Sequence, residues 1–317
     1  MGGDRLAWAG LAAGRRLSGK GSSGYHASMK SVPASGEVDT AAPSGTMNVR
    51  VLRAGLETRF EKDDRVAVEG PLEYMLQHAT LGDEPISFGT TMRTPGDDEN
   101  LAVGLLYGEG IINQRSDIDA VESSTRRPNV VNVRLRPQVR FELQPPSRRF
   151  SAGSSCGVCG TTGLDAAIAR AAATRISDGG TVELATVLGL PELMRRQQSK
   201  FGDTGGVHAA ALFDFAGTLQ DIAEDVGRHN ALDKLVGRSL MTGRLPLKDN
   251  IVLLSGRASY ELVQKALRAG VAVLAAIGAP SSLAVNLARA SGLTLAGFVR
   301  ATQCNVYSNP QRLIAAR

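Results

Sequence analysis

Two cysteines three positions apart are the residues of this chain best suited to do chemistry. Cys156 and Cys159 lie in the segment Ser-Ser-Cys-Gly-Val-Cys-Gly, whose small residues leave both sulfurs accessible, and a helix is predicted to begin at Thr161. A thiolate near a helix N-terminus has a lowered pKa and a larger reactive fraction. The pair therefore suits a redox dithiol, half of a zinc site, or a relay that carries sulfur as a persulfide.

A zinc site would need two further ligands, for which Cys304, His208 and His229 are the candidates. The signatures of zinc proteases (H-E-x-x-H) and zinc deaminases (H-x-E with P-C-x-x-C) are absent from the sequence. We therefore expect no permanently bound metal, and we expect Cys304 to be a buried small residue rather than a third relay thiol. Three cysteines also argue against a secreted disulfide framework, so a reducing, cytoplasmic location is predicted.

A second group of polar residues follows three apolar runs of the C-terminal half. The groups are Ser255–Ser259, Gly278–Ser282 and Arg300–Gln303. In open α/β sheets, ligands bind beyond the carboxyl ends of strands, where helix N-termini point amide donors outward. Glycines allow close backbone approach, and arginines such as Arg257 and Arg300 pair with phosphates, so we expect a phosphorylated or nucleotide-like ligand. The alternative is that the serines are only helix N-caps and the arginines only surface residues.

A third group, Glu224–Asn230, lies at the predicted junction of a strand and a helix. It is either part of a site, to which His229 would contribute, or a satisfied structural network with Asn230 as the helix cap. Seven arginines also precede or surround the cysteine segment, and they form either a basic approach to it or a solvated face. They are Arg126, Arg127, Arg134, Arg136, Arg140, Arg148 and Arg149.

The apolar runs Ile251–Leu254, Val271–Ile277 and Leu293–Val299 predict buried strands, separated by helices over Tyr260–Arg268 and Leu283–Ala290. Buried strands that alternate with helices predict a parallel or mixed sheet covered on both faces, which places this half in the α/β class.

Three further elements are predicted before these runs. Ala209–Phe213 and Leu219–Ile222 flank Gly217 like a hairpin, and Leu164–Ala173 has the composition of a helix. A helix over Ala185–Gln198 is expected to be interrupted at Gly189 and Pro191.

The N-terminal half has a different pattern. Residues 1–46 are rich in Gly, Ser and Ala without a sustained period, which predicts a disordered tail. Residues 47–147 read as a smaller α+β domain, and residues 148–317 as the α/β domain. Within the smaller domain, alternation predicts strands flanking Pro71, at Ile86–Met92 and around Val131–Leu135, and acidic residues open a helix from Asp97 to Leu106.

The composition excludes several classes of protein. No apolar run approaches the roughly 20 residues of a membrane span, so no membrane partner is expected. Residues 1–53 hold seven basic and three acidic side chains, out of 36 and 31 in the whole chain, so the remainder is nearly neutral. With only 4% aromatic residues, this balance argues against nucleic acid as a partner.

Seven segments form a combination far more specific than any one of them. They are Met92–Asp98, Tyr107–Ile111, Ser154–Gly160, Gly205–His208, Asp225–Lys234, Ser255–Ser259 and Ala279–Val285. In this order they resemble the FdhD family, the sulfur carrier proteins required for formate dehydrogenase activity. The resemblance runs from about Arg59 to Tyr307 and does not cover the tail.

The resemblance implies a cytidine-deaminase-like C-terminal domain, with a mixed sheet between helices and without the deaminase zinc site. It implies a sulfurtransferase-type carrier, on which Cys156 holds the persulfide and Cys159 is its partner. A cysteine desulfurase would supply the sulfur, which would pass to the molybdenum bis(molybdopterin guanine dinucleotide) cofactor before that cofactor enters formate dehydrogenase. A chaperone that delivers the cofactor without sulfur chemistry is the alternative.

The resemblance also implies which residues hold the cofactor, and that the protein forms a homodimer. The family's cofactor-binding stretch corresponds to Phe298, Val299, Arg300, Ala301, Thr302 and Gln303. Arg257, Ser281 and His229, from the two polar groups described above, complete the predicted cofactor-binding residues.

Overall fold

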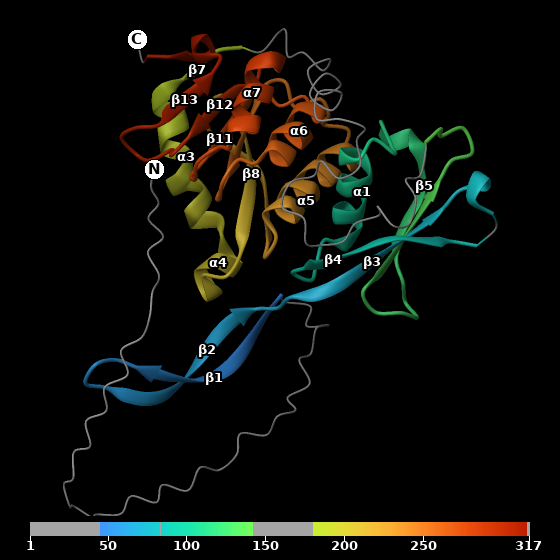
Figure 1. Cartoon of the computed structure of the whole chain (residues 1–317), viewed down its shortest axis with the longest axis horizontal. Coiled ribbons are helices and arrows are strands. Elements are labelled where there is room, and N and C mark those ends of the chain that lie inside the picture. Colours follow the sequence, from blue (N-terminus) through green and yellow to red (C-terminus); the bar gives the residue numbers. More distant parts are fainter. Residues whose placement is uncertain (1–44, 83, 142–179, 316–317) are drawn as a thin grey trace, which may run out of the picture. The chain divides into compact units, whose positions relative to one another are not determined.

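The computed structural model describes residues 45–82, 84–141 and 180–315, which form a mixed α/β fold (Figure 1). The predicted division at residue 147, the helix over Leu164–Ala173 and all but the end of the predicted tail lie outside the described residues. None of the described helices is long and apolar enough to cross a membrane.

The larger sheet of the described residues has the strand order β13-β12-β11-β10-β8-β9. β10, β11 and β12 are parallel to one another, whereas β8, β9 and β13 join the sheet as antiparallel strands. The prediction of a parallel or mixed sheet is therefore confirmed, and so is the hairpin around Gly217, which has a positive φ of 86°. The strands are β8 (His208–Asp214), β9 (Leu219–Asp225), β10 (Asn250–Leu254), β11 (Val273–Ala276), β12 (Thr294–Gly297) and β13 (Asn305–Ser308).

Helices cover both faces of this sheet, as its continuous apolar strands require. On one face, α3 (Leu184–Gln197) packs its buried side chains against one hydrophobic cluster. On the other face, a second cluster contains side chains of α5 (Arg228–Met241), α6 (Tyr260–Arg268) and α7 (Ser282–Ser291). The predicted helices of this half coincide with α6 and α7 to within a residue or two.

The expected interruption of the helix at Gly189 and Pro191 was wrong, because α3 is continuous through both residues. Proline removes one backbone hydrogen bond from a helix interior. Val187, Leu190 and Met194 are fully buried at helical spacing, and this packing against the sheet favours the helix despite the lost bond. A short helix, α4 (Ser199–Thr204), follows.

The smaller sheet has the order β4-β3-β6-β5 and packs against α1 (Asp98–Gly108). Leu72, Tyr74 and Leu76 alternate with more exposed residues along β3, as the sequence pattern predicts. Pro71 lies inside β3 rather than between two strands. It is tolerated there because β3 pairs with β6 only from Glu73 onward. The strands are β3 (Gly70–Gln77), β4 (Ile86–Arg93), β5 (Ile118–Ser123) and β6 (Val130–Leu135).

The helices α1 and α5 pack closely because glycines lie at their contact. A Cβ atom on Gly104 would lie 1.9 Å from the backbone oxygen of Asp233, and one on Gly237 would lie 1.9 Å from that of Asn100. No side chain fits at either position, so the two helix backbones can approach each other. α1 packs on the smaller sheet and α5 begins at the edge of the larger sheet. The contact between the two helices therefore connects the two sheets.

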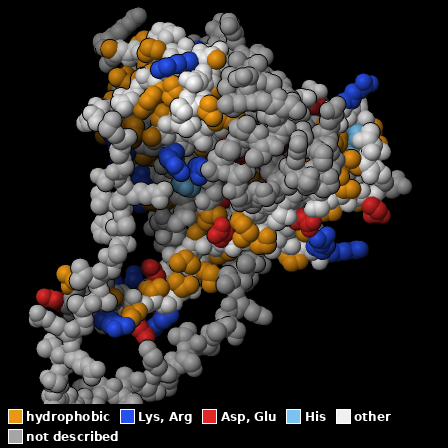
Figure 2. Space-filling model, viewed as in Figure 1, with side chains coloured by type: hydrophobic (Ala, Val, Ile, Leu, Met, Phe, Trp, Pro, Cys, Tyr) orange, Lys and Arg blue, Asp and Glu red, His pale blue; other side chains and the backbone are white. Residues whose placement is uncertain are grey.

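The sequence did not predict the hairpin of β1 (Thr46–Ala54) and β2 (Arg59–Ala67). Its two strands pair only with each other among the described strands, and its side chains are mostly exposed. Hydrophobic and charged side chains are interspersed along it (Figure 2), so it lacks a clean apolar face that would reveal it in the sequence. A parallel pair of two-residue strands, β7 (Val182–Glu183) and β14 (Leu313–Ile314), completes the described strands.

Candidate functional site

The polar segments that follow β10, β11 and β12 lie side by side at one edge of the larger sheet, as the sequence predicts. We call this region the strand-end edge. Backbone hydrogen bonds join the segments: Gly278 N donates to Gly256 O at 2.9 Å, and Phe298 N donates to Gly278 O at 3.1 Å. A Cβ atom on Gly278 would lie 2.8 Å from Gly256 O, so only glycine permits this approach.

Three helices begin at the strand-end edge. Ser259 and Ser281 are the N-caps of α6 and α7, and their hydroxyls accept hydrogen bonds from the amides of Leu262 and Ala284. The N-cap of α5 is Gly227, which offers no side chain. The serines thus serve as N-caps, which was the structural alternative, while the edge also carries the positive ends of three helix dipoles.

The predicted cofactor stretch leaves β12 as a tight turn, in which Arg300 N donates to Gln303 O at 2.9 Å. Phe298 is 44% exposed, whereas the Val299 side chain is fully buried and can offer a ligand only its backbone. The Arg300 guanidinium donates to the carbonyls of Ile277 and Val299, both at 2.8 Å, which fixes it across the end of β11. Ala301, Thr302 and Gln303 are exposed.

Two of the other predicted binding residues, Arg257 and His229, lie near Arg228 and His208, which the predicted cofactor-binding set did not include. His229 lies in the first turn of α5 beside Arg228, and His208 begins β8. The His208 ring packs on the segment that carries Arg257. The evidence is that a Cβ atom built on Gly256 would lie only 3.2 Å from that ring. Lys or Arg side chains lie beside a histidine at the surface in Figure 2.

Both histidines favour the neutral form. Burial lowers the pKa of His229 to about 4, and Lys265, Arg228 and His208 contribute to the decrease although Glu261 opposes it. Burial also lowers the pKa of His208, with Arg228 and Arg257 acting in the same direction and Asp225 against it. The Nε2 atom of His229 lies 3.2 Å from the Ser259 hydroxyl and 3.4 Å from a Glu261 carboxylate oxygen.

A buried ion pair lies behind His229. Lys265 Nζ is 2.5 Å from Asp233 and 3.8 Å from Glu261, and both Lys265 and Asp233 are almost fully buried. Burial would lower the pKa of Lys265, but the carboxylates of Asp233, Glu261 and Glu109 outweigh it and raise that pKa. Lys265 is therefore a cation whose charge is already compensated.

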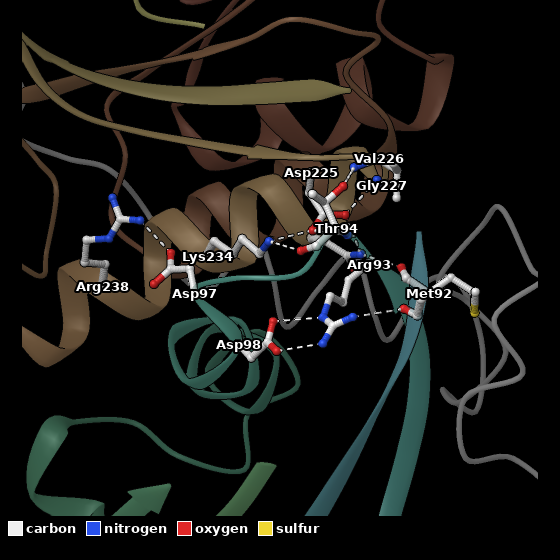
Figure 3. Close-up of polar contacts among 12 residues, drawn as sticks. Met92, Arg93, Thr94, Asp97, Asp98, Asp225, Val226, Gly227, Lys234 and Arg238 are labelled. Carbon is white, nitrogen blue, oxygen red and sulfur yellow. Dashed lines mark hydrogen bonds and ion pairs between the residues drawn. The ribbon is translucent and has the colours of Figure 1, made fainter. Parts of the chain in front are cut away.

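The polar group Glu224–Asn230 is mainly a structural network, which joins the start of α5 to the segment before α1 (Figure 3). Asp225 is fully buried and accepts hydrogen bonds from the amides of Thr94 at 3.1 Å and Gly227 at 2.8 Å. It also forms a 2.7 Å ion pair with Lys234, whose ammonium donates to Thr94 O at 2.9 Å. Asn230 is not the helix cap; it lies inside α5 and bonds Asp225 and the Met92 carbonyl.

The segment before α1 forms the other side of this network. Arg93 is 2% exposed and pairs with Asp98 at 2.8 Å. Asp97, the N-cap of α1, pairs with Arg238 of α5 at 2.5 Å (Figure 3). Two of the segments that carry the resemblance, Met92–Asp98 and Asp225–Lys234, therefore contact each other, and together they fix where α5 begins.

The described members of the arginine-rich group behave mostly as a solvated face. Arg127 pairs with Glu73 at 2.6 Å, and Arg134 pairs with Asp119 at 2.5 Å, all on the surface. Arg136 and Arg140 are exposed, and Arg148 and Arg149 lie outside the described residues.

Cys156 and Cys159 also lie outside the described residues, so their geometry and that of the loop that carries them stay predictions. Cys304 is half-buried against the hydrophobic cluster that contains α3, and burial raises the pKa of its thiol. In the part of the chain that the structure describes, no three His, Cys, Asp or Glu side chains lie close enough to hold a metal ion.

The structure adds Arg228 and His208 to the candidate cofactor-binding residues; the sequence had suggested His208 only as a zinc ligand. Both lie in segments that the sequence analysis singled out, but a sequence does not show which charged side chain lacks a partner. That information requires the three-dimensional positions of the neighbouring carboxylates.

Comparisons with known proteins agree with the resemblance. The model of the FdhD/NarQ family matches residues 72–314. A Streptomyces avermitilis protein named sulfur carrier protein FdhD is 45% identical over 274 residues, which cover 84% of this chain and 93% of the relative. A Mycobacterium tuberculosis protein of the same name is 41% identical over 281 residues, which cover 84% of this chain and 98% of the relative.

A solved structure supports the same fold. The crystal structure of a formate dehydrogenase accessory protein from Desulfotalea psychrophila superposes with a TM-score of 0.64 at 24% identity, over 85% of this chain and 99% of that chain. The family match spans most of the chain, includes the larger sheet and nearly all of the four-stranded sheet, and contains every segment that forms the strand-end edge. On this evidence the chain belongs to the FdhD/NarQ family.

Proposed function

We propose that this protein is a sulfur carrier that serves formate dehydrogenase by passing sulfane sulfur to a molybdenum cofactor. The observation that carries the proposal is the strand-end edge, where glycine backbones, three helix N-termini and several arginines converge. Such an edge suits a polyanionic nucleotide ligand. The names of the relatives supply the sulfur-carrying part of the proposal.

In the first step, the Cys156 thiolate attacks the terminal sulfur of a persulfide on a cysteine desulfurase. The bond between the two donor sulfurs breaks, and its electron pair stays on the desulfurase cysteine as a thiolate. Cys156 then carries the persulfide. No net oxidation or reduction occurs, because one disulfide-type bond replaces another.

In the second step, the Cys159 thiolate attacks the Cys156 sulfur. The sulfur–sulfur bond of the persulfide breaks, and the outer sulfur leaves with the electron pair as hydrosulfide for the client. This sulfur is reduced by two electrons, and the two cysteines are oxidised to a disulfide. A thiol reductant must then restore the dithiol.

The client in this proposal is the molybdenum bis(molybdopterin guanine dinucleotide) cofactor, which is cargo. The chemistry of the described residues fits it. Gly278 leaves no room for a Cβ, and a Cβ on Gly256 would crowd the His208 ring at 3.2 Å, so both glycines allow close backbone approach, while Arg257 and the amide ends of α6 and α7 suit phosphates. Phe298 offers an exposed ring on which a base can stack.

The remaining binding residues would act around these groups. Arg300 is held by two backbone carbonyls and would present its other guanidinium nitrogens, and Ala301, Thr302 and Gln303 would offer backbone and side-chain contacts. Ser281 can donate its hydroxyl proton because its oxygen accepts from Ala284 N. His229 would offer a neutral ring. The cytidine-deaminase-like fold, the homodimer and the cytoplasmic location remain part of the proposal.

The test is intact-mass spectrometry after incubation with a cysteine desulfurase and cysteine. The wild type is expected to gain one sulfur that a reductant removes, and Cys156→Ala is expected to gain none. Cys159→Ala should retain the persulfide because it lacks the attacking thiol. Cys304→Ala is the matched control and should behave like the wild type. No gain in the wild type with an active desulfurase would refute sulfur carriage.

The alternative is a chaperone that binds and delivers the cofactor without sulfur chemistry. It is favoured by one observation: the binding features of the described residues all suit a nucleotide, and none of them needs a thiol. Activation of formate dehydrogenase separates the two functions. Loss of activation in Cys156→Ala, with cofactor binding retained, supports the carrier, and unchanged activation supports the chaperone.

A further inference from the structure

We propose that two copies of this chain join along the outer edge of β2, so that their β1–β2 hairpins form one four-stranded antiparallel sheet. This inference rests on the homodimer of the proposed function and deepens it, because it names the surface that joins the copies. It does not depend on sulfur carriage.

The hairpin lacks the neighbouring strands that usually stabilise a pair of strands. β1 and β2 pair with each other over nine residues and with no other described strand (Figure 1). Seven of the nine residues of β2 are exposed, and only its last part is tied to a helix, where Arg65 pairs with Asp203 of α4 at 2.7 Å. An isolated two-stranded hairpin is at best marginally stable in water, and three or more strands are usually needed. A further strand is therefore expected along the hairpin.

The charges of β2 are complementary to themselves when two copies run antiparallel. A twofold axis through Asp63 places Glu61 opposite the partner's Arg65, and Lys62 opposite the partner's Asp64. Charged residues on an edge strand usually prevent pairing, because like charges would meet. Here opposite charges meet instead, which favours the pairing of two strands, and the symmetry repeats each pair. The edge of β2 therefore suits a second copy of itself.

The apolar residues of β2 meet in the same arrangement. Phe60 is 50% exposed and Val66 is 36% exposed. The axis through Asp63 places Phe60 opposite the partner's Val66, and an aromatic ring opposite a β-branched side chain is a favourable cross-strand pair. Val66 also pairs with Met47 inside the hairpin. Met47, Val66 and the partner's Phe60 would thus form one apolar row, which covers both exposed apolar side chains of β2.

Asp63 itself meets a like charge, because it lies on the axis opposite its own copy. Arg50 of β1 is directly across from Asp63 in the hairpin and lies 3.5 Å from its carboxylate. The axis would therefore cross a row of two aspartates flanked by two arginines, which has no net charge. Arg50 is also 3.3 Å from Glu61, whose charge the partner's Arg65 balances in this arrangement.

Neighbouring registers are less favourable. Alternate residues of β2 direct their backbone groups toward β1, so a twofold axis between two β2 strands must pass through a residue position. An axis at Lys62 would place Lys62 opposite its own copy and Glu61 opposite the partner's Asp63. An axis at Asp64 would place Asp64 opposite its own copy and Lys62 opposite the partner's Val66. The charge pattern thus selects the axis at Asp63.

The edge of β1 does not have this property. β1 contains two arginines and no acidic residue, so two β1 strands could form no opposite-charge pair. Pairing through β2 also keeps the rest of the two copies apart. The chain leaves β2 toward β3 after Ala67, which would lie opposite the partner's Arg59. At about 3.3 Å per residue, the two exits are therefore roughly 25–30 Å apart.

The test is sedimentation equilibrium of the full chain over a range of concentrations. Pairing over nine residues makes a small interface, so the wild type is expected to form a dimer that dissociates on dilution. Lys62→Asp places acidic side chains opposite each other, and Asp64→Lys does the same with lysines. Each variant should weaken association about 10- to 100-fold.

Two combinations make the result specific. An equimolar mixture of Lys62→Asp and Asp64→Lys should regain the dimer, because each variant then faces the opposite charge on the other. Lys62 and Asp64 are 3.2 Å apart within one chain, so exchanging both charges in one variant preserves that contact. This double variant should also dimerise like the wild type. Rescue on mixing shows that each single variant is folded.

The matched controls change the net charge elsewhere. Arg196 and Glu192 form an exposed pair on α3. Arg196→Glu and Glu192→Lys change the net charge by the same amounts as the two hairpin variants, and they should leave the dimer unchanged.

A second measurement locates the axis. Directly opposite residues of two antiparallel strands have Cβ atoms about 4.5–5.5 Å apart, so Asp63→Cys should form a disulfide between two chains on mild oxidation. Asn48→Cys lies on the same face of the hairpin but on β1, and it should not link to its own copy. Peptide mapping by mass spectrometry separates the new link from bonds of the three native cysteines.

The proposal is overturned if Lys62→Asp associates as tightly as the wild type, or if the mixture associates no more tightly than the variants alone. A wild type that stays monomeric at every concentration overturns both this interface and the homodimer. Sulfur carriage fails separately, in the mass-spectrometry test on Cys156. A monomer that accepts sulfur would refute the interface and support the carrier.

Discussion

Replacing Asp225 with Asn should destabilise the protein strongly, because this carboxylate is the centre of the network in Figure 3. The side chain is fully buried and has four partners: Lys234 at 2.7 Å, the amides of Gly227 at 2.8 Å and Thr94 at 3.1 Å, and the Asn230 side chain at 2.9 Å. All four are donors. Asparagine keeps the shape but places its own N–H₂ group against one or more of them.

The magnitude follows from what remains unpaired. Lys234 is 3% exposed and would keep only its hydrogen bond to the Thr94 carbonyl at 2.9 Å. Removing one partner of a buried ion pair costs about 3–5 kcal/mol, because the other charge stays buried without compensation. We therefore expect Asp225→Asn to lower the free energy of unfolding by about 3–5 kcal/mol.

The assay is urea unfolding of the full chain, followed by circular dichroism. Glu192→Gln is the matched control, since that carboxylate pairs with Arg196 on the surface at 65% exposure, and its effect should stay below about 1 kcal/mol. Asp225→Asn combined with Lys234→Met removes both charges and should be more stable than Asp225→Asn alone. A loss below about 1 kcal/mol in Asp225→Asn, or a double variant no more stable than the single one, would refute the reasoning.

Three further outcomes are expected. Gly237→Ala should lower the free energy of unfolding by at least about 3 kcal/mol or prevent folding, because the new Cβ would lie 1.9 Å from Asn100 O. Urea unfolding measures this, and an unchanged stability would contradict the close contact between α1 and α5. His229 should titrate near pH 4 in NMR of the free protein, so it stays neutral from pH 7 down to about pH 5, and a midpoint near 6.5 would show that burial does not control it. The Cys304 thiol should react more slowly with iodoacetamide at neutral pH than Cys156, since burial raises its pKa, and equal rates would disprove this assignment.

Much of the α/β half could be predicted from the sequence because its signals are local. The continuous apolar runs predict β10, β11 and β12, and the intervening helices α6 and α7 have polar N-caps and an apolar face. The position of polar segments after these strands also follows from topology alone, since parallel strands end at the same edge.

Other local patterns gave the wrong answer where tertiary contacts outweighed them. Pro191 suggested a break in α3, but three fully buried side chains hold the helix together. The β1–β2 hairpin has no clean alternation, so the sequence predicted a strand just before Pro71 but neither β1 nor its pairing with β2.

The roles of the charged residues were decided only by the fold. The group Glu224–Asn230 fits a binding site or a structural network equally well in the sequence. The hydrogen bond from Thr94 to Asp225, which shows the network to be structural, joins residues 131 positions apart. The same is true of Arg228, whose neighbours in sequence do not reveal that its buried Nε lacks an acceptor.

The sequence alone therefore determined the family, the class of the sheet and the residue types available for chemistry. Periodicity, glycine spacing and motifs are properties of short stretches of chain, so they can be recognised in the sequence without knowledge of the fold. The tertiary structure decided which charges compensate one another, because Coulomb interactions and hydrogen bonds depend on distances between atoms that lie far apart in the chain. It identified Asp225 and Lys234 as a buried pair, and it showed that the buried Nε atom of Arg228 has no hydrogen-bond acceptor among the described residues.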